Sequence, residues 1–194
     1  HEAYKTLKLK IENSRQDKIG CFTGDLTNME TAYAAKELLG KVFKSNLFES
    51  RTDNYYVNFS NKENYIFNSN IVGIEEADLI LMIGCNPRFE ATILNNRIRK
   101  SYLKSKLPIY STNDVGDQTY PYKILDNSTN LIKDVVESRN ELSEKIIKSS
   151  KPIVIIGQSV LKLKSGQFIF EELKNFLNKN NKINDEWNSL NILS

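Results

Sequence analysis

The sequence is poor in the residues that carry most metal and nucleophilic chemistry. Its 194 residues include two cysteines, Cys21 and Cys85, and a single histidine, His1. An iron–sulfur cluster usually needs four thiolates, a structural zinc needs four Cys or His ligands, and a Ser-His-Asp triad needs a histidine inside the fold. None of these sites can be built from this chain alone. We interpret both cysteines as buried thiols of a reducing compartment.

Long apolar runs and a strong charge bias are also missing. The longest apolar runs, at residues 79–84 and 153–157, are far shorter than the roughly 20 residues of a transmembrane helix, so we expect no direct membrane insertion. The 27 basic residues against 24 acidic ones give a net charge of +3, which does not favour nucleic-acid binding. The abundant residues are instead 23 Asn and 21 Lys, beside only eight Gly, as an AT-rich coding sequence would give.

Short apolar runs alternate with amphipathic helical patterns along the chain. Strands are expected at 18–22, 78–83, 107–110 and 151–157. Helices are expected after a capping box at Thr27 and Glu30, after Pro87, and near 128–136, 140–149 and 166–179. This alternation predicts an α/β fold with a doubly wound, mostly parallel sheet. We expect one domain over 1–194, with an entering helix at 1–17, a weak strand or bend near 55–59 within the poorly readable segment 44–70, and a polar tail at 180–194.

Ligands of open α/β sheets bind at the carboxyl ends of the strands, which here are 23–25, 84–88, 111–114 and 157–159. The strongest candidate is 84–88, because a helix N-terminus after Pro87 together with Arg88 could bind a phosphate group. No GxGxxG or GxxxxGK[ST] motif accompanies it. We therefore favour the alternative that Asn86 and Pro87 start a helix and that Arg88 forms an ion pair.

Two further charged groups flank this unit. Arg97, Arg99 and Lys100 could bind an acidic partner, although a solvated helix face is the favoured interpretation. Glu75, Glu76 and Asp78 precede the strand and so lie at the end of the sheet opposite to ligands. We expect Glu75 and Asp78 to cap or solvate the loop there.

One stretch resembles a known family. Residues 64–105 contain Ala77-Asp78, an apolar strand, the sequence GCNPRFEA at 84–91 and the sequence NRIRK at 96–100. This pattern resembles the molybdopterin-oxidoreductase-like portion of the large iron–sulfur subunit (75-kDa-type or G-type) of respiratory complex I, NADH:ubiquinone oxidoreductase. The wider molybdopterin family shares only the first part of the pattern. The resemblance makes structural or interface candidates of Gly84, Asn86, Pro87, Arg88, Phe89, Glu90, Arg97, Arg99 and Lys100.

The resemblance implies a molybdopterin-oxidoreductase-like domain with a structural, non-catalytic role in the NADH-oxidising peripheral arm, on the matrix side of the mitochondrial inner membrane. It implies no cofactor on this chain, and iron–sulfur clusters and FMN on other parts of the complex. The implied partners are other complex I subunits, notably the cluster-bearing part of the same subunit and the NADH/FMN-binding subunit. The composition fits a fragment or split-gene product of a protist mitochondrion.

Two alternatives stay open. The chain could be part of a true molybdopterin-dinucleotide oxidoreductase, with residues 84–88 at the cofactor. It could also be the nucleotide-binding middle domain of a thiamine-diphosphate-type enzyme, which has a similar strand followed by glycine.

Overall fold

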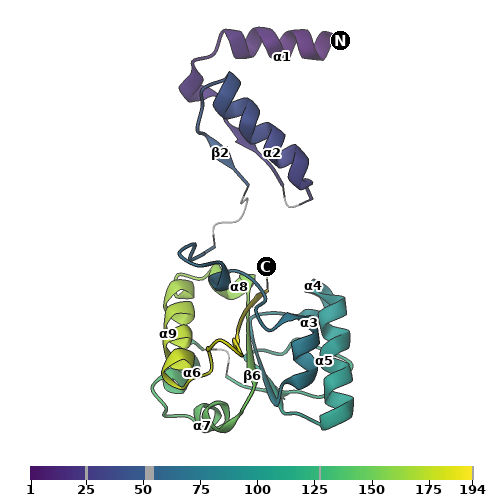
Figure 1. The fold of residues 1–194 in the computed structure, drawn as a ribbon, viewed down its shortest axis with the longest axis vertical. Coiled ribbons are helices and arrows are strands. Elements are labelled where there is room, and N and C mark those ends of the chain that lie inside the picture. Colours follow the sequence, from purple (N-terminus) through teal and green to yellow (C-terminus); the bar gives the residue numbers. More distant parts are fainter. Residues whose placement is uncertain (25, 51–54, 127, 194) are drawn as a thin grey trace. The chain divides into compact units, whose positions relative to one another are not determined.

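The short apolar runs form the strands of a parallel sheet in the computed structural model, which describes residues 1–24, 26–50, 55–126 and 128–193 (Figure 1). The chain divides into two compact units, His1–Asn54 and Tyr55–Ser194. The second unit contains a five-stranded sheet of order β5-β4-β3-β6-β7, in which every neighbouring pair is parallel. Its strands are β3 (Leu79–Ile83), β4 (Ile109–Ser111), β5 (Lys123–Ile124), β6 (Pro152–Gly157) and β7 (Leu190–Leu193).

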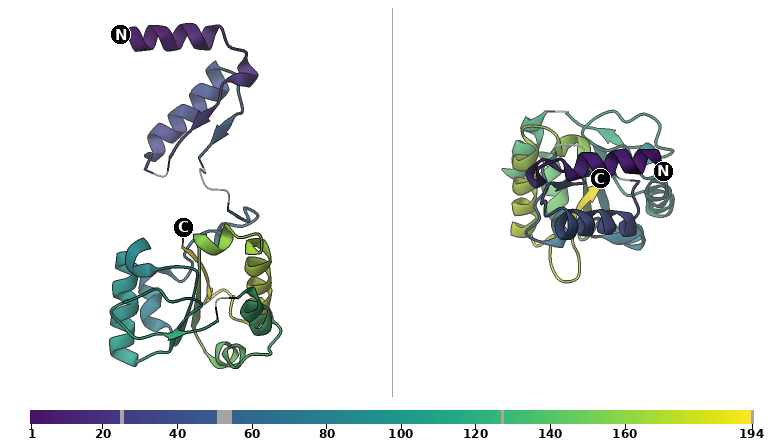
Figure 2. Two further views of the ribbon diagram at one scale, coloured as in Figure 1. Left: turned by 180° about the vertical axis from the view of Figure 1, so that it is seen from behind. Right: turned by 90° about the horizontal axis from the view of Figure 1, so that it is seen from above.

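Helices cover both faces of this sheet. One face carries α3 (Asn70–Gly73), α4 (Pro87–Glu90) and α5 (Thr92–Ser105). The other carries α6 (Thr129–Val136), α7 (Glu141–Lys148), α8 (Gln158–Leu161) and α9 (Gly166–Lys179), and the view from behind shows the same two layers (Figure 2). Short 3-10 turns lie at η3 (Lys62–Asn64) and η4 (Ile74–Glu76). The predicted doubly wound α/β fold is confirmed.

The core of the second unit has two halves, one on each side of the sheet. Successive side chains of a strand point to opposite faces, so Leu81 and Ile83 of β3 join one cluster while Ile80 and Met82 join the other. Every residue of β3 and β6 is buried, as expected for central strands of a parallel sheet. The helix predicted near 166–179 is formed as α9, and its residues Ile169, Leu173, Phe176 and Leu177 are all buried.

The prediction of a polar tail at 180–194 is wrong for its last part. Leu190–Leu193 forms β7, which pairs in parallel with β6. Its outer side is covered because Ile192 N donates a hydrogen bond to Ile66 O, and the Asn68 side chain donates to Leu190 O. The buried Asn191 side chain is satisfied by Ser69, which allows a polar residue in this strand. Of the strand or bend expected near 55–59, the strand is not formed: residues 55–58 have no regular secondary structure, and a turn starts at Phe59.

The first unit contains α1 (Glu2–Glu12), η1 (Gln16–Lys18), β1 (Cys21–Phe22), α2 (Met29–Glu37), the π-helical turn η2 (Leu38–Val42) and β2 (Phe48–Glu49). Its strands pair in parallel. Helix α2 starts one residue later than predicted, because the Asn28 side chain, rather than Thr27, accepts the hydrogen bond from Thr31 N. Leu39 is the only buried apolar side chain among the described residues of this unit.

No helix in the described ranges is long and apolar enough to cross a bilayer.

We predict that amide hydrogen exchange separates the two units. Local stability follows the density of buried apolar contacts, so the amides of β3 and β6 should exchange at least about 100-fold more slowly than those of β1 and β2. Exchange of the whole isolated chain, followed by mass spectrometry of its peptides, measures this ratio. Equal protection of the two strand pairs would contradict the prediction.

Candidate functional site

The carboxyl ends of β3 and β6 meet in the middle of the sheet. The strand order places β4 and β5 on one side of β3, and β7 beyond β6, so the topology switches direction between these two strands. Ligands of open α/β sheets bind in the crevice at such a switch point. Gly84 directly follows β3 and Gly157 ends β6, so both glycines lie at this crevice.

Protein atoms pack closely against both glycines. Gly84 has φ +58°, and a Cβ at this position would lie 2.1 Å from Val160 Cγ2. A Cβ on Gly157 would lie 2.1 Å from the carbonyl oxygen of Gly84. The Ser159 hydroxyl donates a hydrogen bond to that same oxygen, and Thr112 Oγ1 accepts from Gly84 N at 3.3 Å. The two glycines therefore allow close packing of this chain on itself.

The loop after Gly84 is fixed by a hydrogen-bond network. Asn86 holds the N-cap position with Pro87 first in α4, as predicted, but its side chain does not cap the helix. That side chain instead donates to Val115 O and accepts from Gln118 Nε2, each at 3.0 Å. Glu90 Oε1 accepts from Asn86 N at 2.9 Å, which closes the turn from the other end. The predicted continuous helix is interrupted at Ala91, between α4 and α5.

Arg88 ties this turn to the neighbouring loop. Its Nη1 atom donates to the Asp117 carboxylate at 2.7 Å and to the Asp117 carbonyl oxygen. Hydrogen bonds from the Thr119 amide and then from Arg88 lower the pKa of Asp117. The ion pair expected for Arg88 is thus present, whereas Phe89 beside it is 81% exposed.

The basic residues of α5 divide into two groups. Arg97 and Lys100 both bind the Glu75 carboxylate, at 2.5 Å and 2.9 Å. The hydrogen bonds from Lys100 and Arg97 lower the pKa of Glu75. Arg99 has no acidic partner among the residues that the structure describes. Arg97 and Lys100 therefore connect α5 to η4 rather than forming a fully solvated face.

Asp78 caps the loop before β6, rather than the loop at the start of its own strand that the sequence indicated. Its carboxylate accepts hydrogen bonds from Ser150 N at 2.6 Å and from Lys151 N at 3.0 Å. Glu76 forms an ion pair with the Lys151 side chain. These acids lie at the amino end of the central strands, away from the crevice.

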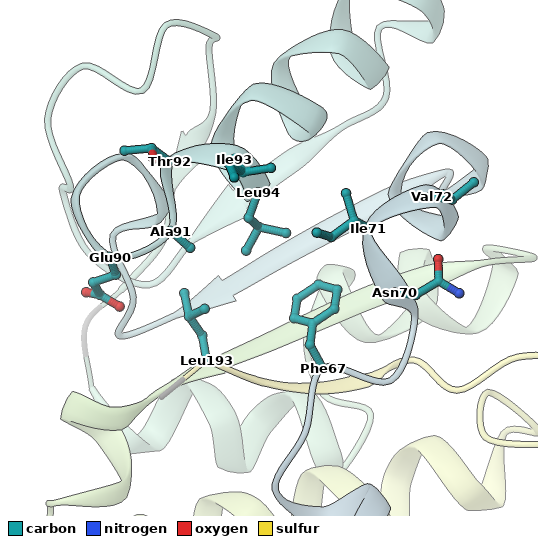
Figure 3. A pocket seen from close by; sticks show the side chains of 10 residues that line it. All are labelled: Phe67, Asn70, Ile71, Val72, Glu90, Ala91, Thr92, Ile93, Leu94 and Leu193. Carbon is teal, nitrogen blue, oxygen red and sulfur yellow. The ribbon is translucent and has the colours of Figure 1, made fainter. Parts of the chain in front are cut away.

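An apolar groove lies beside the turn, between α3 and the start of α5 (Figure 3). Its volume is about 870 Å³. Most of its lining is apolar and comes from three parts of the fold, namely the segment before α3, the facing helices and the end of β7. These apolar residues are Phe67, Ile71, Val72, Ile93, Leu94 and Leu193. Glu90 lies at one end, where it also binds Asn86 N.

Cys85 and Tyr120 are titratable groups buried beneath the turn. Burial raises the pKa of the Cys85 thiol and also raises the pKa of the Tyr120 phenol. The Cys85 side chain is 2% exposed and belongs to the core cluster below α5, so it is a protonated packing group, as predicted. The same prediction is wrong for Cys21, which is only half-buried because it lies in the thinly packed first unit. Across the described ranges, no three His, Cys, Asp or Glu side chains gather as a possible metal site.

Sequence reasoning missed the loop that completes the network. Gln118 is 1% exposed and donates to Asn86 Oδ1 and Val115 O while accepting from Arg88 N. Nothing in its local pattern marks it, because two of these partners lie about 30 residues earlier. Of the other strand ends, Ser111 and Thr112 are buried, and Asp25 lies outside the described residues.

Comparison with known proteins identifies the family of this chain. The sequence pattern of the molybdopterin oxidoreductase family matches residues 1–194. The chain belongs to the molybdopterin oxidoreductase family. The resemblance seen in residues 64–105 is confirmed, because the chain is similar to 75 kDa and 78 kDa subunits of NADH-ubiquinone oxidoreductases.

Three such relatives illustrate the match. The chain is 36% identical to the NADH-ubiquinone oxidoreductase 75 kDa subunit of Reclinomonas americana, over 95% of this chain and 28% of that protein. It is 33% identical to the mitochondrial NADH-ubiquinone oxidoreductase 78 kDa subunit of Candida albicans, over 93% of this chain and 25% of that protein. It is 32% identical to the corresponding 78 kDa subunit of Neurospora crassa, over 98% of this chain and 25% of that protein. The chain thus spans about a quarter of these relatives, and the matches do not favour a thiamine-diphosphate-type enzyme.

The family name implies a pterin cofactor, and the packing beside Gly84 and Gly157 leaves no room for a phosphate group of such a cofactor at these two positions. The space above Gly84 is occupied by Val160, and the face of Gly157 is occupied by the Gly84 carbonyl group. A dinucleotide needs backbone glycines that leave room for phosphate, whereas these glycines make room for protein. The nearby Cys85 thiol is buried and protonated, so it offers no thiolate to a metal.

We predict that Gly84→Val destabilises the second unit by about 2 to 4 kcal/mol, because the substitution combines a left-handed φ with overpacking against Val160. Gly116→Ala is the matched control, since Gly116 has φ +70° and no atom within 4 Å of its added Cβ. This control should lose only about 1 to 2 kcal/mol. Urea unfolding measures both values, and equal losses would show that packing at Gly84 is unimportant.

We also predict a pH-dependent contribution from Glu75. The pKa of Glu75 is lowered in the folded chain, so its ionised form stabilises the fold above its unfolded pKa of about 4.3, and this contribution is lost as the pH falls through the lowered folded value. Glu75→Gln should therefore lower the urea midpoint at pH 7 and have little effect near pH 3.

Glu144→Gln is the control for this experiment, because Glu144 forms only an exposed ion pair with Lys148 on α7. Its midpoint should stay close to that of the unchanged chain at both pH values. A Glu75→Gln effect of the same size at both pH values would contradict the electrostatic explanation.

Proposed function

We propose that the chain is a non-catalytic structural portion of the peripheral, NADH-oxidising arm of mitochondrial NADH:ubiquinone oxidoreductase. The observation that carries this proposal is the close packing of the chain on itself at Gly84 and Gly157, where β3 and β6 end, in a chain similar to 75 kDa and 78 kDa subunits of such complexes. The position where related folds receive a ligand is here used for internal packing. A role in holding other parts of the complex is the function that such a site supports best.

A scaffold serves redox chemistry by keeping distances constant. Electron transfer between cofactors slows steeply as they move apart, so the protein that surrounds them must be rigid. Features of this chain supply rigidity: the buried strands β3 and β6, the network around Asn86 and Gln118, and the binding of Arg97 and Lys100 to Glu75. These are structural roles for the residues of the family pattern.

The partners that we propose are the cluster-bearing part of the same subunit and the NADH/FMN-binding subunit. The iron–sulfur clusters and FMN belong to those parts, and this chain binds none of them. We place the chain on the matrix side of the inner membrane. The exposed Phe89 and Arg99, both within the family pattern, are candidates for contacts with these partners.

The deciding experiment is native electrophoresis of mitochondrial membranes from the organism that encodes this chain. The gel is stained for NADH dehydrogenase activity, and peptides of the chain are sought in every band. We expect them in the large NADH-active band. Their presence only in a small soluble band would overturn the proposal.

Metal and pterin analysis of the band that contains the chain separates the remaining alternative. We expect iron but no stoichiometric molybdenum or tungsten. One molybdenum or tungsten per chain would instead identify a true molybdopterin-dinucleotide oxidoreductase.

A further inference from the structure

The excess positive charge of the chain is concentrated on helix α5 and the residue after it. Between Glu90 and Asp114 the sequence has five basic residues and no acidic one. The other 22 basic residues are outnumbered by the 24 acidic residues of the chain, so this segment accounts for the net charge of +3. A local excess of one charge attracts partners of the opposite charge. The five basic residues are Arg97, Arg99, Lys100, Lys104 and Lys106.

The chain itself neutralises only part of this charge. The single carboxylate of Glu75 binds both Arg97 and Lys100. In the ranges that the structure describes, Arg99 and Lys104 have no acidic partner. Most of the positive charge on α5 is therefore not compensated by the described residues.

The dipole of α5 explains the two cations at its end but not Arg99. Lys104 lies in the last turn and Lys106 directly follows the helix, where a positive charge is favourable. Lys106 also lies over the Tyr102 ring, with Nζ 4.7 Å from the ring centroid. The effect of the dipole is limited to the last turn, whereas Arg99 lies near the middle of the 14-residue helix. Neither the dipole nor an ion pair with a described residue accounts for the charge of Arg99.

Arg99 belongs to a continuous exposed face of α5. Residues three or four apart are neighbours on a helix surface, so Arg99 lies beside Asn96 and Leu103, and Lys100 lies beside Lys104. All five side chains are exposed. Figure 1 and Figure 2 both show α5 on the outside of the helical layer. We call these five residues the basic face.

The basic face carries a repulsion that the described chain does not relieve. Lys100 and Lys104 are about one turn apart, and like charges at this spacing destabilise a helix. Glu75 offsets Lys100 only in part, because the same carboxylate binds a second cation. Carboxylates of a partner would relieve the repulsion, and the planar guanidinium group of Arg99 suits them. Leu103, which is 56% exposed among these cations, would add an apolar contact.

We infer that the basic face binds a carboxylate-rich surface on another polypeptide segment of the NADH-oxidising complex. This inference rests on the proposed function and names the surface through which one partner is held. A protein fits the face better than a nucleic acid does, because the face is limited to one helix and the rest of the chain is not basic.

Arg99→Glu tests this contact in cells of the organism that encodes the chain, with Lys164→Glu as the matched control. Both cations are exposed, neither has an acidic partner among the described residues, and both substitutions change the charge equally. Lys164 lies just before α9, on the opposite face of the sheet. Neither substitution should change the melting temperature of the isolated chain.

We expect Arg99→Glu to reduce incorporation into the NADH-active band at least about tenfold, because like charges would then meet at the contact. Lys164→Glu should leave incorporation unchanged. Normal incorporation of Arg99→Glu, or an equal loss in both variants, would overturn the inference.

Zero-length crosslinking identifies the partner directly in the complex that contains the unchanged chain. A water-soluble carbodiimide joins a lysine amine to a carboxylate only where the two groups are in contact. The link between Lys100 and Glu75, whose charged atoms are 2.9 Å apart, serves as the internal standard. We expect mass spectrometry to find Lys104 joined to an Asp or Glu of a different segment of the complex. A link to a second copy of this chain, or no link from Lys104 to another segment, as a lipid or nucleic-acid partner would give, overturns the inference.

The proposed function and this contact fail in different ways. Absence of the unchanged chain from the NADH-active band would overturn the proposed function. Its presence there, without a crosslink from Lys104 to another segment, would overturn only the contact.

Discussion

Direct backbone packing between the ends of β3 and β6 is the contact on which the arrangement of the second unit depends. These strands form the centre of the sheet, and their side chains supply both halves of the core. At their carboxyl ends neither Gly84 nor Gly157 has room for a Cβ, because Val160 packs against Gly84 and the Gly84 carbonyl oxygen packs against Gly157. This packing sets the direction in which each chain segment leaves the sheet. The turn toward α4 and the turn toward α8 both start from this contact.

The turn and the groove are consequences of that contact. Once Gly84 directs the chain away from the sheet, Asn86, Arg88 and Glu90 fix the turn through hydrogen bonds to the loop at 115–118 and to each other. The turn positions the start of α5, and Glu75 holds that helix against η4. Most residues of one short family pattern thus hold the turn and α5 in place. Phe89 and Arg99 of the same pattern are instead exposed to solvent.

The sequence predicted the sheet and helices of the second unit well, since continuous apolar runs and a 3.6-residue period report burial directly. It failed where burial depends on distant partners. Asn191 made Leu190–Leu193 look like part of a polar tail. It can nevertheless be buried in a strand because its side chain is satisfied by Ser69, which is far away in the sequence. The role of Gln118 could not be predicted from the sequence for the same reason, because its partner Asn86 is distant along the chain. No residue pattern near Ala91 predicts the break between α4 and α5. The predicted ion pair of Arg88 is present, but only the structure identifies Asp117 as its partner.

The packing beside the two glycines also limits how this protein can change over time. Space beside both glycines would require that Val160 become smaller and that the Gly84 carbonyl move away from Gly157, which are alterations in two different segments of the chain. Removing the valine alone would leave a cavity, and separating the strand ends alone would break their packing. Each single step lowers stability without providing a binding site. No single substitution at this contact therefore opens space beside the two glycines without a loss of stability.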